Sequence, residues 1–102
     1  MKRQSLFLSL LLLLASVTSA QAAYLSGCWR NVKNGNLPCY IEQNGNQVIF
    51  TNENGSRSYG ELISGSEAVA FDWGYIHARL AGQGNVLLWD GNGEWDRDYR
   101  CD

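Results

Sequence analysis

From residue 23 onward, the chain alternates short apolar runs with polar turns that carry glycine. The runs are rich in Val, Ile, Leu, Phe, Tyr and Trp, and a glycine separates them about every ten residues. This pattern is typical of strands joined by tight hairpins, and no stretch shows helical periodicity. About eight strands are predicted, at 26–33, 37–43, 47–52, 56–63, 67–72, 75–81, 85–89 and 94–99.

The short connections determine the predicted strand order. Strands joined by roughly two to five residues must be antiparallel neighbours, so the chain is expected to form an up-and-down meander. Such a meander leaves two exposed edges unless its first strand meets its last, and closure removes both. We therefore predict an all-β antiparallel fold over 23–102, a single domain that forms a closed or nearly closed small barrel. A split two-sheet sandwich is the alternative.

Alternation along each strand predicts which side chains face the interior. An eight-stranded barrel has an interior that side chains can fill or that can hold one small ligand. The side chains expected inside are Trp29, Cys39, Ile41, Val48, Phe50, Leu62, Val69, Phe71, Ile76, Leu80, Leu87, Trp89 and Trp95.

Residues 1–22 have the pattern of a signal peptide. A basic start precedes an apolar stretch over 6–17, and 20–22 form a small-x-small cleavage site. We expect the mature chain to begin at Ala23 and to be periplasmic or secreted. The apolar stretch is shorter than the roughly 20 residues that span a bilayer, so no transmembrane span is expected.

The charge balance narrows the possible partners. Without the two basic residues of the first 22, six basic residues remain against ten acidic ones, which gives a net charge of −4. A mildly acidic chain without a basic run argues against nucleic acid as a partner.

Three cysteines in an exported chain predict one disulfide and one free thiol. In a closed meander with an even number of strands, the start of the first strand and the finish of the last strand lie at the same end of the barrel. Cys28 and Cys101 should therefore pair, with Cys39 a buried free thiol beside Ile41. The runner-up is Cys28–Cys39 across the first hairpin. A Cys39–Cys101 link would contradict the closed meander.

The first and last strands carry the residues of a known pattern. Gly27 and Trp29 open the first strand, and Arg97 follows Trp95 by two positions. Here the chain resembles the lipocalin and avidin (calycin-like) barrel superfamily, whose members begin with Gly-x-Trp and pack a basic side chain across that indole. The resemblance implies the barrel architecture and structural roles for these four residues. It implies no ligand, because this chain is shorter and lacks a recognisable set of polar ligand-binding residues.

The final hairpin adds a second resemblance. Trp89, Asn92, Gly93, Trp95 and Arg97 match, with one position slipped, a Trp-x-Asn-Gly-x-x-Trp-x-Arg pattern. The chain is similar in this hairpin to small exported bacterial proteins of unknown function.

Two candidate chemistries are weak on sequence grounds. The stretch 90–96 begins like a calcium loop, but Trp95 stands where the sharp bend needs glycine and Cys101 stands where the bidentate glutamate belongs. A thiol enzyme using Cys39 and His77 is the other candidate. An exported thiol tends to be oxidised, and no local pattern orients the imidazole. We expect no metal, no cofactor and no enzymatic activity.

Two modification signals stay open. The segment 25–28 matches the pattern that precedes acylation on cysteine in bacterial lipoproteins, which would make the chain a lipid-anchored structural envelope protein acylated at Cys28. The apolar region ends well before this cysteine, which favours an ordinary signal peptide. Asn54 heads a glycosylation acceptor that matters only where secreted proteins are glycosylated.

The remaining prediction is a binding site at one barrel end. The connections at 52–55, 72–75 and 90–94 should bring together Trp73, Tyr75, Trp89 and Asp90. Rings at an open end can stack on a sugar or a hydrophobic peptide. We predict an exported non-enzymatic binding or inhibitory module whose partner is a small molecule, a glycan or a protein.

Overall fold

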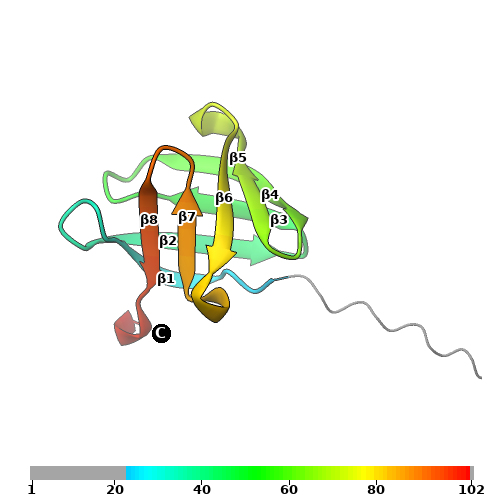
Figure 1. Cartoon of the computed structure of the whole chain (residues 1–102). Coiled ribbons are helices and arrows are strands. Elements are labelled where there is room, and N and C mark those ends of the chain that lie inside the picture. The colour runs from blue at the N-terminus through cyan, green and yellow to red at the C-terminus, as the bar shows by residue number, and fades with distance from the viewer. Residues whose placement is uncertain (1–22, 102) are drawn as a thin grey trace, which may run out of the picture.

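The computed structural model describes residues 23–101, and the predicted signal peptide lies outside the described residues. Within that range, eight antiparallel strands follow one another in chain order and close into a barrel (Figure 1). The strands are β1 (Gly27–Asn31), β2 (Leu37–Asn44), β3 (Gln47–Thr51), β4 (Arg57–Ser64), β5 (Glu67–Ala70), β6 (Ile76–Ala81), β7 (Val86–Trp89) and β8 (Gly93–Arg97). The predicted all-β meander and small closed barrel are confirmed.

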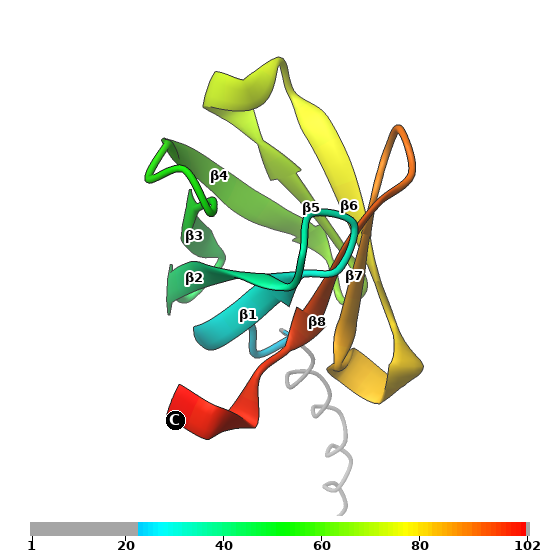
Figure 2. The same ribbon diagram turned by 90° about the vertical axis from the view of Figure 1, so that its left-hand side faces the viewer.

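Closure depends on pairing between the first and last strands. Trp29 of β1 lies opposite Arg97 of β8, and Asn31 lies opposite Trp95 in the same antiparallel ladder. Figure 2 shows β1 and β8 side by side in the turned view. Every strand therefore has two neighbours and no sheet edge is left open to another chain, which excludes the two-sheet sandwich.

Within residues 23–101, three short 3-10 turns lie at the two ends of the barrel. They are η3 (Phe71–Trp73), η4 (Gly82–Gly84) and η5 (Tyr99–Cys101). In Figure 1, η3 and the β7–β8 connection lie at the upper end, and η4 and the chain's C-terminal part lie at the lower end. We call the upper end the mouth and the lower end the latch end. The described part of the chain holds no helix with the length and apolar character that crossing a bilayer requires.

The barrel interior is filled by side chains from every strand. The buried core cluster consists of Leu25, Trp29, Cys39, Ile41, Val48, Phe50, Leu62, Ala68, Ala70, Ala78, Leu87, Trp89 and Trp95. Two other predicted interior residues, Ile76 and Leu80, are partly buried and pack against it. The alternation of apolar and polar residues along the strands therefore predicted most of the core residues. In a closed barrel, one side of each strand faces the apolar interior and the other faces solvent.

The prediction was wrong for two interior residues around β5. Val69 is buried, but its strand partners are Glu61 and His77, which lie on the outer face of the barrel. Its neighbours Ala68 and Ala70 face the core instead. A register irregularity between Leu62 and Ser64 shifts the pairing of β5. Phe71 is also outside the core, because β5 ends at Ala70 and Phe71 begins η3.

Glycine at position 60 allows the large rings to fit. A Cβ atom there would overlap the backbone carbonyl oxygen of Val69 and lie 2.9 Å from the Phe50 ring. The absence of a side chain at position 60 thus leaves space for the Phe50 ring of the neighbouring strand β3, as close packing of a small barrel requires.

Arg97 and Trp29 pack together at the latch end. The Arg97 guanidinium carbon lies 4.4 Å from the centroid of the fully buried Trp29 ring, and the indole N–H donates a hydrogen bond of 2.8 Å to the Leu25 carbonyl. Gly27 precedes this ring with a φ of 126°, a conformation that L side chains rarely adopt.

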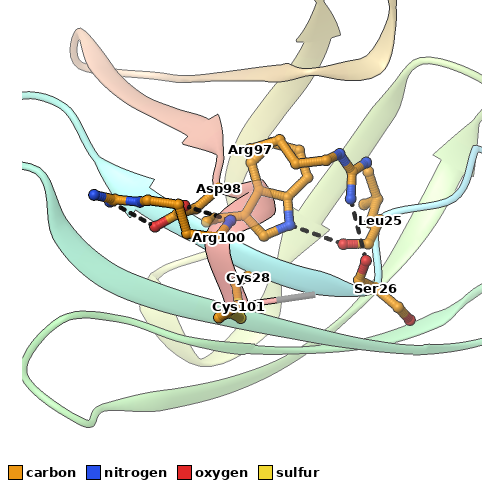
Figure 3. Close-up of a disulfide and its surroundings, with 8 residues drawn as sticks. Leu25, Ser26, Cys28, Arg97, Asp98, Arg100 and Cys101 are labelled. Atoms are coloured by element: carbon orange, nitrogen blue, oxygen red, sulfur yellow. Dashed lines mark hydrogen bonds and ion pairs between the residues drawn. A yellow bond between two sulfur atoms is a disulfide. The ribbon is translucent and has the colours of Figure 1, made fainter.

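The same guanidinium joins three backbone segments, and Figure 3 shows its hydrogen bond to Ser26. Arg97 donates hydrogen bonds to the carbonyl oxygens of Tyr24 at 2.8 Å, Ser26 at 3.1 Å and Gly84 at 3.1 Å. These contacts join the segment before β1, the end of β8 and the β6–β7 connection. We call the Arg97 side chain with these partners the latch.

The disulfide joins Cys28 to Cys101 beside the latch (Figure 3), with their Cα atoms 6.2 Å apart. That separation lies within the usual range for bridged cysteines. Cys39 is free and fully buried in the same cluster as Ile41. The predicted pairing is confirmed, and the runner-up Cys28–Cys39 is excluded.

Candidate functional site

A cavity of about 270 Å³ opens at the mouth, between the β3–β4, β5–β6 and β7–β8 connections. The side chains around it include two acidic groups, two amides and three indoles. They are Asn31, Asn52, Glu53, Trp73, Trp89, Asp90 and Trp95. We call this space the mouth cavity.

Four aromatic rings form the floor beneath the mouth cavity. The rings belong to Phe50, Trp73, Trp89 and Trp95, and all six pairs have centroids between 5.1 and 6.4 Å apart. Five of the six pairs cross at angles of 60–74°. Steeply crossed rings at these distances make favourable edge-to-face contacts, so the floor is a rigid aromatic surface.

Hydrogen bonds to neighbouring turns fix the position of Trp73. The Ser58 hydroxyl accepts from the Asp72 backbone N–H at 2.9 Å, and the Asp72 carboxylate accepts from the Tyr59 backbone N–H at 2.9 Å. The Trp73 indole N–H then donates to the Ser56 hydroxyl at 3.0 Å. Because Ser56 ends the β3–β4 turn, this bond joins two of the mouth connections.

The structure brings together three of the four residues predicted for this site. Trp73, Trp89 and Asp90 all line the mouth cavity. Tyr75 does not, because its ring packs on Phe71 at 5.5 Å and is 67% exposed on the outside of the barrel. The placement of Tyr75 was wrong because this residue takes a φ of 59°, which ends the strand alternation assumed for it.

Glu53 is a mouth residue that the sequence reasoning missed. Its carboxylate accepts hydrogen bonds from the side-chain amides of Asn31 at 3.0 Å and Asn34 at 2.7 Å. Burial alone would raise the pKa of Glu53, but the amide of Asn34, the residue's own backbone N–H and the amide of Asn31 outweigh burial and lower it. Glu53 is therefore ionised at neutral pH.

Trp89 carries an unsatisfied polar atom. Its side chain is only 8% exposed, and among the described residues its indole N–H has no hydrogen-bond partner. A buried donor without an acceptor costs about 1–3 kcal/mol. Trp89, a residue that lines the mouth cavity, therefore carries a buried donor without a partner among the described residues.

Cys39 and His77 do not form a catalytic pair. Cys39 is buried on β2, inside the barrel, with its sulfur 3.7 Å from a Glu53 carboxylate oxygen. His77 lies on β6, and its imidazole contacts Glu67 at 2.6 Å on the outward face. Because β2 and β6 are not neighbours in the barrel, these two groups are not brought together.

The Cys39 thiol is also a poor nucleophile. Burial, followed by the negative charge of Glu53, raises its pKa to about 12. The thiolate is the reactive form of cysteine, and the raised pKa keeps the Cys39 thiol protonated at pH 8. Cys39 therefore packs in the core as a protonated thiol.

We predict that the native protein does not react with a thiol-alkylating reagent at pH 8, because Cys39 is buried and protonated. One equivalent should react once the chain is unfolded in denaturant without reductant. Intact-mass measurement before and after unfolding gives the number of alkylated thiols in the folded and in the unfolded protein. Stoichiometric labelling of the folded protein would show that this thiol is accessible and activated.

The 90–96 segment forms the β7–β8 turn and the start of β8. Residues 23–101 contain no group of three or more His, Cys, Asp or Glu side chains that could hold a metal ion.

No protein-family model, curated protein or solved structure matches this chain. The barrel is compatible with a calycin-like fold, and the functional inference rests on the mouth cavity itself.

Proposed function

We propose that the protein is an exported, non-enzymatic binding module that holds a small ligand in the mouth cavity. The observation that carries this proposal is the cavity of about 270 Å³ above four packed rings. Small-ligand sites are typically concave, aromatic and provided with a few polar groups. Here those polar groups are Asn52, Glu53 and Asp90.

The arrangement of chemical groups supports binding over catalysis. A nucleophile needs an adjacent base and an orienting third group. The buried thiol of Cys39 has a raised pKa, and the imidazole of His77 lies on a different strand. A rigid floor with fixed polar groups suits recognition, because little conformational freedom is lost when a ligand binds.

The disulfide supports export to an oxidising compartment. It also bears on the lipid-anchored alternative, because a Cys28 sulfur bonded to Cys101 is not available for acylation. The ordinary signal peptide over 1–22 is therefore the form of export that we favour.

The latch supports the resemblance to the lipocalin and avidin superfamily. Gly27, Trp29 and Arg97 carry that resemblance in the sequence, and the guanidinium lies over the indole. We propose that the chain is a short bacterial variant of such a barrel. The tight hairpins leave only a shallow mouth for a ligand in place of a deep central cavity.

Native mass spectrometry of the mature protein, incubated with a small-molecule extract of the expressing cells, tests the binding function. We expect an adduct with the wild type and with the control variant Tyr75→Ala, whose ring lies outside the mouth. Trp73→Ala should lose the adduct, because it removes part of the floor. The absence of any adduct, or an equally abundant one on Trp73→Ala, would contradict the proposal.

A further inference from the structure

We infer that the ligand of the mouth cavity is a small organic ammonium ion, an inference that rests on the proposed binding function. The chemistry that selects such an ion is a set of indole rings next to carboxylates that no cation neutralises. Each part of this arrangement is present at the mouth.

The first part is the charge of the lining. Glu53 and Asp90 line the cavity, and no Lys, Arg or His is among the described residues around it. The ion pairs of the described chain are Arg30–Asp96, Glu67–His77 and Asp98–Arg100, so neither mouth carboxylate is paired with a cation. A site of this kind repels phosphate or carboxylate ligands and attracts a positive charge.

The second part is the aromatic floor. Indole is the best of the aromatic side chains at attracting a cation, and the attraction grows when the cation is desolvated. The planes of Trp73, Trp89 and Trp95 cross at 60–68°. Trp89 and Trp95 are 8% and 4% exposed, so the partly exposed Trp73 is the ring most open to a cation in the cavity.

The third part is the size of the site. A cavity of about 270 Å³ has room for a small organic ammonium ion, and its size favours a small cation over an extended peptide.

Choline and its neutral isostere 3,3-dimethyl-1-butanol provide the test, because they differ mainly in charge. Isothermal titration calorimetry of the mature protein measures both affinities, and tryptophan fluorescence reports on the floor. We expect choline to bind at least about tenfold more tightly than the isostere, as cation–π and carboxylate attraction both require the charge. Glucose serves as a neutral sugar probe and should not bind.

Variants that each remove one carboxylate charge test whether choline binds in the mouth cavity. Glu53→Gln and Asp90→Asn should each weaken choline binding by about three- to tenfold and leave the affinity for the isostere unchanged. Glu42→Gln is the matched control, because Glu42 is exposed on β2 and does not line the mouth cavity. It should leave both affinities unchanged.

The possible failures are distinguishable. If the isostere or glucose perturbs the mouth tryptophans and choline binds no better, the ammonium inference is overturned and the binding function survives. If choline binds equally well to all three variants, its site is elsewhere and the inference is also overturned. If none of the three probes binds, the ammonium inference falls, and the adduct measurement decides the binding function separately.

Discussion

Replacing Cys28 and Cys101 together by serine should lower the free energy of unfolding by about 4 kcal/mol, the loop-entropy estimate for a bridge across so long a segment. The two cysteines are 73 residues apart, so the bridge restricts nearly the whole unfolded chain. A domain of this size has a small core and correspondingly little stability to lose. Urea unfolding of the oxidised wild type and the double variant measures the difference.

Reduction supplies the control for this prediction. Dithiothreitol should lower the unfolding midpoint of the wild type to near that of the double variant, and it should leave the double variant unchanged. A wild type whose midpoint does not respond to reductant would show that the bridge contributes nothing to stability.

Arg97→Ala should destabilise the barrel by about 3 kcal/mol, because it removes three charge-assisted hydrogen bonds and a cation–π contact at once. The loss leaves the carbonyls of Tyr24, Ser26 and Gly84 without this donor. It also uncovers the buried Trp29 ring. Urea unfolding monitored by circular dichroism measures the change.

Two further variants separate the latch from a general effect of charge. Arg97→Lys keeps the positive charge but has fewer donors in a different geometry, so it should recover only part of the loss. Arg79→Ala removes an exposed arginine from the outer face of β6 and should change stability by less than about 0.5 kcal/mol. Equal losses in Arg97→Ala and Arg79→Ala would show that the latch has no special role.

The strand number, the closure and the disulfide could be predicted because they depend on local signals and topology. Turn residues such as Gly45 and Gly55 adopt the left-handed backbone that tight hairpins need. Short connections then allow only antiparallel neighbours. Once an even-stranded meander closes, the positions of Cys28 and Cys101 follow from which end each strand occupies.

The register of β5 could not be predicted in the same way. Its inward residues, Ala68 and Ala70, are small, so they give a weaker hydrophobic signal than Val69, which faces out. The irregularity that sets this register lies in the preceding strand. Sequence alternation alone cannot show such a shift, because a slip of one residue exchanges the two faces.

The candidate site was only partly predictable. Trp73, Trp89 and Asp90 were found because they are aromatic or acidic residues next to turns at the same barrel end. Glu53 was missed because its significance depends on Asn31 and Asn34, which lie about twenty positions earlier in the chain. A contact between two distant turns leaves no local pattern.

Peptide mapping without reduction tests the closed meander most directly, because both the latch and the mouth depend on β1 meeting β8. The mature protein is alkylated in denaturant and then digested, and the linked peptides are identified by mass spectrometry. We predict one linked pair that contains Cys28 and Cys101, with alkylated Cys39 in a separate peptide. A peptide pair linking Cys39 to Cys101 would contradict the strand order, the barrel closure and the site built on them.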